Sequence, residues 1–206
     1  RDSLQELVKV ARSEVGRLDA IITQFLRALR PSPPQLERAD IAGLLRDTLD
    51  LMRSEIENRR IDVAVTSAEG VPPVRIDPGQ IRQVFFNLIK NALEAMPDGG
   101  TMVISFSVGD VYLTLDFLDS GQGIAPDDFN RIFEPYHTTK SNGHGLGLMI
   151  VQRIIQEHGG QIEVSSKPNT GTRFRILLPL AERRIRKIEA PAPAEGDPPR
   201  PPTEKH

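Results

Sequence analysis

The sequence predicts an α+β fold that follows a long helical segment. Three observations lead to this prediction: stretches with a helical apolar repeat, stretches in which apolar and polar residues alternate, and a heptad pattern at the start of the chain. A repeat near 3.6 residues indicates a helix packed on a core, and strict alternation indicates a half-buried strand. The chain has 206 residues, which is more than one average domain and fewer than two full ones.

The heptad pattern occupies residues 1–30, where apolar side chains recur at alternating spacings of four and three. They are Leu4, Val8, Ala11, Val15, Leu18, Ile22, Phe25 and Leu29. Such a seam predicts a long helix that needs a partner helix, either in a second copy of the chain or in a segment missing from this sequence. The alternative is an ordinary amphipathic helix packed on its own domain. However, a strict seven-residue repeat does not match the 3.6 residues per turn of a straight helix, so its apolar stripe would gradually turn away from a globular core. We therefore expect a helical bundle and a homodimer formed through this segment.

The remaining elements are predicted from local patterns. In chain order they are a linker at residues 31–39, helix 40–59, strands 61–65 and 74–76, helix 77–96, strands 102–108 and 111–118, helix 146–158, and strands 161–165 and 172–178. Pro31-Ser32-Pro33-Pro34 stiffens the linker. Asp40 and Asp77 are placed as N-caps, the second before a proline that suits the first helical position. Gly109-Asp110 favours a hairpin, and Gly159-Gly160 ends the last helix.

Two segments lack these periodic patterns. Residues 120–143 are rich in polar, glycine and proline residues, and a connection this long inside a compact domain is usually functional, as a lid is. Residues 181–206 form a tail rich in Pro, Ala and Glu that cannot bury a core, so we expect this tail to be disordered.

Composition excludes several classes of protein. Hydrophobic residues make up 38% of the chain and charged residues 26%. The net charge of −2 gives no indication of a surface that binds nucleic acid or an anionic membrane. The lack of cysteine rules out disulfides and thiolate catalysis. No apolar run reaches the roughly 20 residues that a transmembrane helix needs. Because the chain starts at Arg1, we expect a cytoplasmic fragment of a longer protein, with any sensor or membrane anchor upstream.

Asn87, Asn91 and Glu94 share one face of the helix at 77–96, apart from its apolar face. Two side-chain amides one turn apart offer carbonyl oxygens, which suit Mg²⁺ bound to the phosphates of a nucleotide. The alternative is that these polar residues only solvate the exposed side of the helix.

Two glycine clusters follow. In Asp119-Ser120-Gly121-Gln122-Gly123 the carboxylate can accept a hydrogen bond from an amino group, and the glycines allow a close approach. Gly143-His144-Gly145-Leu146-Gly147-Leu148 opens an apolar helix, whose free N–H groups suit phosphate. Either cluster alone could be an ordinary turn or helix start, and the second matches neither a P-loop nor the dinucleotide fingerprint. Together they predict a site that holds a purine nucleotide at both ends.

In this combination the chain resembles the catalytic, ATP-binding domain of two-component sensor histidine kinases, within the gyrase, heat-shock, kinase and mismatch-repair ATPase superfamily. The resemblance covers about residues 36–180 and rests on motifs in family order. They are Asn87-Leu88-Ile89-Lys90-Asn91-Ala92-Leu93-Glu94-Ala95, Asp119 to Gly123, Phe129-Asn130-Arg131-Ile132-Phe133-Glu134-Pro135, Gly143 to Leu148, and Gly171-Thr172. The stretches Glu134-Pro135 and Thr138-Thr139-Lys140 are most similar to the nitrogen-regulation subgroup.

The resemblance implies a Bergerat-type ATP-binding fold at residues 40–180, a two-layer α/β sandwich whose mixed sheet carries helices on one face. Residues 1–30 resemble the second helix of the family's dimerisation hairpin. The expected organisation is therefore a partial dimerisation helix, the linker at 31–39, the catalytic domain and the tail.

ATP and Mg²⁺ are the implied ligands. Asn87 and Asn91 would hold the metal ion and Asp119 would recognise adenine, while residues 124–142 would form a mobile lid packed by Phe129 and Phe133. The implied nucleotide-binding residues are Asn87, Asn91, Glu94, Asp119, Gly121, Gly123, Ile124, Lys140, Gly143, His144, Gly145, Leu146, Gly147, Leu148 and Thr172. Two departures stand out, because the family usually has Thr or Ser at the position of His144 and another aromatic pair at Tyr136-His137.

The family reaction moves the γ-phosphoryl group of ATP to a histidine and then to an aspartate of a response regulator receiver domain, which is the implied partner. The acceptor histidine is followed by an acidic residue on the first helix of the hairpin. The four histidines here are His137, His144, His158 and His206, and none has that context. No catalytic residue is therefore assigned, and we expect slow or no autophosphorylation by residues 1–206 alone.

Three alternatives remain open on sequence grounds. A gyrase-like or mismatch-repair-like ATPase usually has an acidic general base at the position of Asn87. A serine-directed anti-sigma kinase shares the motifs but usually lacks a long heptad helix before them. A non-catalytic dimeric scaffold could sense nucleotide through a degenerate site, although the intact Asn87, Asn91 and Asp119 weigh against it.

Overall fold

The computed structural model of the protein describes residues 33–137 and 145–180. The predicted helix at residues 1–30 and the predicted tail at residues 181–206 lie outside the described residues, as do the site candidates Lys140, Gly143 and His144. None of the helices in the described ranges is both long and apolar enough to cross a membrane.

Single helices and pairs of strands follow one another along most of the described chain. In order they are β1 (Glu37–Ala39), α2 (Ile41–Asn58), β2 (Ile61–Thr66), β3 (Val74–Ile76), α3 (Pro78–Ala95), β4 (Gly100–Val108), β5 (Tyr112–Asp119), α4 (Pro126–Phe129), α5 (Gly147–Glu157), β6 (Gln161–Lys167) and β7 (Gly171–Pro179). The helices and strands predicted between residues 40 and 178 are thereby confirmed, with ends that shift by a few residues. Two short elements were not predicted: β1, in the segment interpreted as a linker, and α4, in the segment interpreted as a lid.

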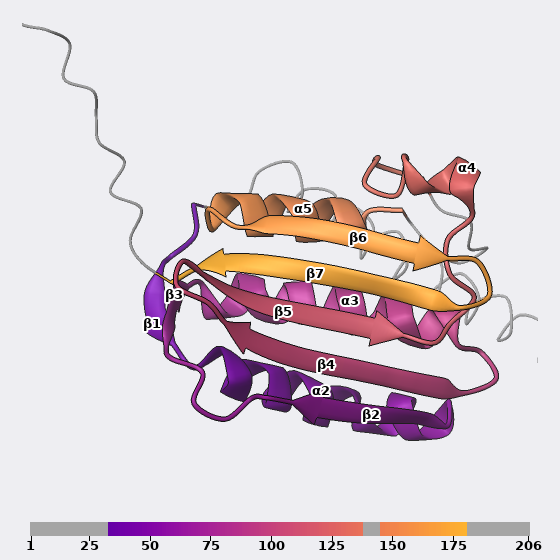
Figure 1. Ribbon diagram of the computed structural model, residues 1–206, viewed down its shortest axis with the longest axis horizontal. Coiled ribbons are helices and arrows are strands. Elements are labelled where there is room, and N and C mark those ends of the chain that lie inside the picture. Colours follow the sequence, from indigo (N-terminus) through magenta and orange to yellow (C-terminus); the bar gives the residue numbers. More distant parts are fainter. Residues whose placement is uncertain (1–32, 138–144, 181–206) are drawn as a thin grey trace, which may run out of the picture.

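The main sheet has five strands in the order β2-β4-β5-β7-β6. β2 runs parallel to β4, and the other neighbouring strands are antiparallel, so the sheet is mixed. β1 and β3 form a separate antiparallel pair. Helices α2, α3 and α5 lie side by side on one face of the main sheet, as Figure 1 shows, with α3 in the middle in contact with both neighbours. This is the predicted two-layer arrangement.

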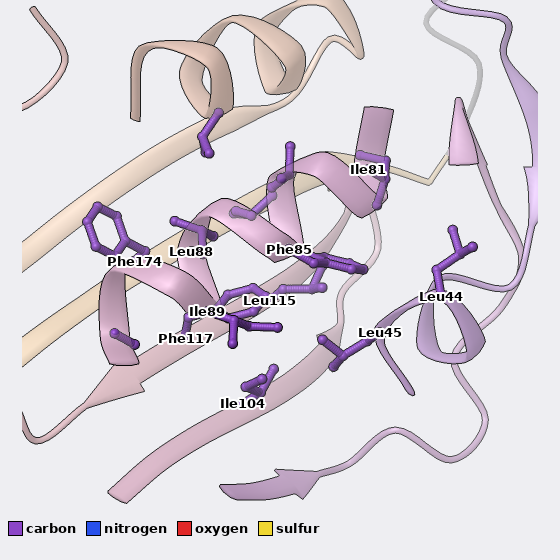
Figure 2. Close-up of a cluster of buried hydrophobic side chains, with 14 of the residues drawn as sticks. Leu44, Leu45, Ile81, Phe85, Leu88, Ile89, Ile104, Leu115, Phe117 and Phe174 are labelled. Atoms are coloured by element: carbon purple, nitrogen blue, oxygen red, sulfur yellow. The ribbon is translucent and has the colours of Figure 1, made fainter. Parts of the chain in front are cut away.

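The core fills the space between the helices and the sheet. Alternate residues of the central strands point to the helices and are buried; they are Met102, Ile104, Phe106, Leu113, Leu115, Phe117, Phe174, Ile176 and Leu178. In Figure 2, side chains of α3 such as Phe85 and Ile89 point to this face of the sheet. The rings of Phe85 and Phe117 lie 5.8 Å apart, centroid to centroid, in a tilted contact. Because the apolar face of α3 packs on the sheet, the opposite, polar face of this helix remains available for other roles.

Capping residues set where α2 and α3 begin. The Asp40 side chain accepts a hydrogen bond from the N–H of Gly43 at 2.9 Å. The Asp77 side chain accepts from the N–H groups of Gly79 and Gln80 at 2.9 and 3.1 Å. Both carboxylates thus satisfy N–H groups that lack partners within the helix, as predicted from the sequence.

Asp77 and His158 join three parts of the chain. The Asp77 carboxylate also accepts from the N–H of Gln35, before β1, at 3.0 Å. The N–H of Asp77 donates to Nε2 of His158 at 2.9 Å, and Nδ1 of that imidazole lies 2.7 Å from the carbonyl oxygen of Ile154 in α5. Since a carbonyl can only accept, the proton sits on Nδ1 and the imidazole is neutral in this arrangement. The start of α3, the end of α5 and the chain before β1 are therefore held together.

Candidate functional site

The register of the sheet gathers polar side chains in one row across it. Asp119, the last residue of β5, pairs with Met102 of β4 and with Thr172 of β7, and Thr172 pairs with Ser166 of β6. Because directly paired residues point to the same face, Asp119, Thr172 and Ser166 share the helix-covered face with the core. We call this row the Asp119 end of the site. It lies where the apolar alternation of β5 stops.

The carboxylate of Asp119 is buried, with 6% of the residue exposed. Its Oδ1 accepts hydrogen bonds from the N–H of Gly121 at 2.9 Å and from the N–H of Thr172 at 3.3 Å. A buried carboxylate is tolerated only when such donors compensate for lost water. The predicted Asp119 and Thr172 are thus brought together, and the carboxylate is held in a fixed orientation.

Glycines allow the chain to close around this carboxylate. A methyl group at Gly121 would lie 2.7 Å from both Cβ and the carbonyl oxygen of Ala95, at the end of α3. At Gly171, with φ of +129°, a methyl group would overlap the carbonyl oxygen of Asp119. Only glycine fits either position without a shift of the backbone. The sequence predicted a close approach of Gly121 to a ligand, and this stays a prediction; its closeness to Ala95 was not predicted, and Gly171 was named only as part of a family motif.

Ser166 is a site residue that was not predicted from the sequence. Its Oγ accepts from the N–H of Ile124 at 2.9 Å and donates to the carbonyl oxygen of Gly171 at 2.9 Å. It also lies 3.0 Å from Oγ1 of Thr172, which is 5% exposed. The predicted site residue Ile124 is therefore tied to β6 and β7 through its backbone. The predicted strand ended at Ser165, so no local pattern in the sequence pointed to Ser166.

The second end of the site lies where α3 meets the start of α5. The side chain of Asn87 is almost fully buried, with the residue 9% exposed, and its Nδ2 has no hydrogen-bond partner among the described residues. A methyl group at Gly147, the first residue of α5, would lie 3.5 Å from Oδ1 of Asn87. The N-cap residue Leu146 makes no side-chain capping bond to α5. We call this region the Gly147 end, and it combines an unsatisfied buried amide with the N-terminus of an eleven-residue helix.

One face of α3 connects the two ends. Asn87, Asn91 and Ala95 follow at spacings of four, so they lie above one another on the helix. The helix rises about 12 Å from Asn87, at the Gly147 end, to Ala95, at the Asp119 end. Asn91 and Glu94 are half-buried between them, and Oε1 of Glu94 lies 3.9 Å from Nζ of Lys90. The two ends are thus far enough apart for an elongated ligand.

The segment between the two ends packs partly on the core. Ile132 is buried and Phe133 is half-buried against the core, while Phe129 is half-buried at the end of α4. The N–H of Tyr136 donates to the carbonyl oxygen of Gly145 at 3.1 Å, and Nε2 of His137 lies 3.2 Å from Oδ1 of Asp128. Phe133 thus has the packing role expected for it, and Ile132 is a further anchor, which was not predicted as one. The candidates between residues 138 and 144 lie outside the described residues.

Comparison with known proteins agrees with this arrangement. A family model described as histidine kinase-, DNA gyrase B-, and HSP90-like ATPase matches residues 76–182. Sporulation kinase E of Bacillus subtilis (strain 168) is 37% identical over 174 residues, which are 84% of this chain and 24% of that protein. Sensor histidine kinase ZraS of Escherichia coli (strain K12) is 33% identical over 175 residues, or 85% of this chain and 38% of that protein. The chain thus spans well under half the length of these relatives.

Solved structures show the same fold. Full-length ShkA in complex with AMPPNP superposes with a TM-score of 0.76 at 28% identity, over 86% of this chain and 39% of that one. Histidine kinase ThkA in complex with the response regulator protein TrrA gives a TM-score of 0.72 at 26% identity, over 86% of this chain and 52% of that one.

Proposed function

This chain belongs to the histidine kinase-, DNA gyrase B- and HSP90-like ATPase family, and we propose from this premise how its site holds ATP and what the whole protein does with it. The described domain is a histidine kinase ATP-binding catalytic domain. The whole protein, we propose, transfers the γ-phosphoryl group of ATP to a histidine nitrogen and then to an aspartate of a response regulator. The single observation that carries the proposal for the site is the buried carboxylate of Asp119 at the end of β5. Two backbone N–H groups hold it in place.

Adenine would bind at the Asp119 end. The carboxylate accepts hydrogen bonds only, so it suits the exocyclic amino group of adenine and disfavours a carbonyl group in the same place. The backbone at Gly121, whose N–H group binds the Asp119 carboxylate, would lie close to the base. Since Gly121 and Thr172 already hold Oδ1, the carboxylate is oriented before the ligand arrives, which lowers the entropic cost of binding.

The phosphates would bind at the Gly147 end. The first N–H groups of α5 have no partners within the helix and point out of its N-terminal end. The helix dipole favours negative charge at that end. The buried amide of Asn87, whose nitrogen has no partner among the described residues, supports a ligand at this place because such a group otherwise costs stability. Backbone donors at Gly145 and Gly147 would add to it, and Leu146 and Leu148 would cover it from the core side.

Mg²⁺ fits the donor set at this end. Asn87 and Asn91 would hold it through their amide oxygens, together with oxygens of the phosphates. When bound, the ion supplies charge neutralisation on the β- and γ-phosphates during transfer. The remaining work of this chain is positioning: phosphoryl transfer needs an in-line arrangement and stabilised charge more than a reactive side chain of the protein. This explains why the site can lack a general base.

The acceptor and the partners are proposals about the whole protein. Histidine kinase ThkA forms a complex with the response regulator protein TrrA, and we propose a receiver domain as partner here as well. The heptad pattern at residues 1–30 supports a homodimer whose helices present the acceptor histidine. Because none of the four histidines of this sequence precedes an acidic residue, the acceptor would be supplied by another segment or another chain.

The binding of Mg-ATP to Asp119→Asn tests the proposed site. Asparagine keeps one carbonyl oxygen that can accept from Gly121 and Thr172, so the fold should persist, but its NH₂ group would face the amino group of adenine as a second donor. We expect affinity to fall at least a hundredfold, since a buried mismatch of this kind costs about 3 kcal/mol or more. Isothermal titration calorimetry measures the affinity.

Asp110→Asn is the matched control, because Asp110 lies exposed in the turn between β4 and β5 and receives the same substitution. It should bind like the native chain. Equal affinity of Asp119→Asn and Asp110→Asn, with both folded by circular dichroism, would refute the assignment of Asp119 to the base.

A further inference from the structure

Ser166 is the centre of a hydrogen-bond cluster beside Asp119 that the proposed function does not use. One oxygen atom, Oγ of Ser166, meets three partners: the N–H of Ile124 at 2.9 Å, the carbonyl oxygen of Gly171 at 2.9 Å and Oγ1 of Thr172 at 3.0 Å. These partners come from the segment after β5 and from the start of β7. A serine hydroxyl has one proton and two lone pairs, so all three contacts can be satisfied in only one way.

Counting donors gives the direction of the Thr172 contact. The carbonyl oxygen of Gly171 can only accept, so it takes the proton of Ser166. The N–H of Ile124 can only donate, so it takes one lone pair. Ser166 has only a lone pair left for Thr172, and the hydroxyl of Thr172 must therefore donate to Ser166. The proton of Thr172 is turned to β6, and its own lone pairs are what a ligand at the Asp119 end would meet.

We infer that Ser166 is a positioning residue for base selection: by fixing the Thr172 hydroxyl as an acceptor, it makes the Asp119 end select a purine with an amino group at position 6 over one with a carbonyl there. This inference rests on the proposed function, since it assumes that the base binds beside Asp119. The carboxylate and the fixed hydroxyl would then form one wall of acceptors. A purine 6-carbonyl oxygen would meet acceptors only, with no donor from either side chain.

Removal of the Ser166 hydroxyl should relax this selection. In Ser166→Ala the proton of Thr172 loses its acceptor and can turn to donate to a 6-carbonyl oxygen. Inosine diphosphate is the suitable probe, because it differs from ADP only in the 6-carbonyl group and the proton on the adjacent ring nitrogen. The quantity to measure is the ratio of the Kd for Mg-IDP to the Kd for Mg-ADP, by calorimetry on the 206-residue chain. We expect this ratio to fall roughly tenfold in Ser166→Ala, the size of one hydrogen bond gained.

Three further variants separate selection from simple support of the loop. Ser166→Thr keeps the hydroxyl and should keep the native ratio. Ser165→Ala changes the exposed neighbour on the opposite face of β6, and it should bind both nucleotides like the native chain. Thr172→Val removes the acceptor but supplies no donor, so its ratio should fall less than that of Ser166→Ala. The double variant should match Thr172→Val, because no hydroxyl is left to turn to the base.

Each outcome bears on one claim. A parallel loss of affinity for both nucleotides in Ser166→Ala, with an unchanged ratio, would mean that Ser166 only supports the loop and would overturn the inference. Should Ser166→Ala fail to fold, an unchanged ratio in Thr172→Val would overturn it equally. If the native chain binds neither nucleotide, the proposed function fails instead, so the two failures are distinguishable.

Discussion

Gly171 is the first residue of β7 and lies directly beside the backbone of Asp119, the last residue of β5. Two separate demands act on it: its φ of +129° disfavours any side chain, and a methyl group would overlap the carbonyl oxygen of Asp119. Gly70 shares the first demand, with φ of +75°, but a methyl group there would meet no atom within 4 Å. The pair therefore separates backbone strain from steric overlap.

Substituting these two glycines by alanine should have unequal effects. Gly70→Ala should lower the free energy of unfolding by about 1 kcal/mol, the cost of a left-handed conformation. Gly171→Ala should lower it by roughly 3 kcal/mol, since overlap with a backbone atom adds to that cost. Urea denaturation followed by circular dichroism measures both. Similar losses in the two variants would contradict the close approach of β7 to Asp119.

At this scale the sequence predicted the residues whose chemistry is evident from local context. Asp119 ends an alternating strand and precedes two glycines, and Asn87 and Asn91 share a helical face with the right spacing. Ser166 could not be found in this way, because its role depends on which residues β6 and β7 place opposite each other. A serine in an exposed-looking strand has no local feature that separates it from Ser165. Knowledge of the register was needed.

At the scale of elements, α3 is the part on which the site depends most. Its apolar side packs on the sheet, its polar side runs between the two ends of the site, and its start is fixed by Asp77. Burial alone would raise the pKa of the Asp77 carboxyl, but hydrogen bonds from the N–H groups of Gln35, Gln80 and Gly79 hold this pKa below its usual value. The charged form of Asp77 is therefore favoured by folding.

This linkage predicts how Asp77→Ala depends on pH. A carboxyl whose pKa is lower in the folded state stabilises the protein above its pKa in the unfolded chain, and the stabilisation is lost as the pH falls through the folded value. At pH 7 the variant should be less stable by about 1 kcal/mol or somewhat more, the usual cost of losing an N-cap. Near pH 2 the difference should be smaller, because the charge of Asp77 is then at least partly lost while the neutral carboxyl still accepts hydrogen bonds. Urea denaturation at both pH values measures it, and a difference that does not shrink in acid would contradict the role of the charge.

The elements that the sequence predicted are those with enough residues to show a period. α2, α3 and α5 each span three turns or more, and β4, β5 and β7 alternate over eight or nine residues. β1 has three residues and pairs with β3, which lies far along the chain, so no local pattern marks it. α4 has four residues and buries none of them. Tertiary pairing, rather than local preference, determines such short pieces.

At the scale of the whole molecule, the sheet and the three helices place the two ends of the candidate site along α3. The strand order β2-β4-β5-β7-β6 brings the end of β5 beside the start of β7. Gly121, just after β5, lies against Ala95 at the C-terminal end of α3, and the N-terminus of α5 lies near Asn87. The residues of the candidate site lie up to 85 positions apart in sequence, from Asn87 to Thr172. The family motifs predicted this convergence, although spacing alone could not.

The described domain covers only part of what the proposed reaction needs. It would bind ATP with the γ-phosphate accessible to the acceptor. The acceptor histidine would come from a helical hairpin of the kind suggested by residues 1–30. The chain spans 24% and 38% of the two relatives named above, so those proteins contain further segments beyond the part that this chain matches.

A crystal structure of this chain with AMPPNP and Mg²⁺ is the most direct test of the proposed site. We expect the amino group of the base within hydrogen-bond distance of the Asp119 carboxylate, beside Thr172, and the phosphates at the first turn of α5 with the ion held by Asn87 and Asn91. A nucleotide bound with its base away from Asp119, or with its phosphates away from the start of α5, would contradict it.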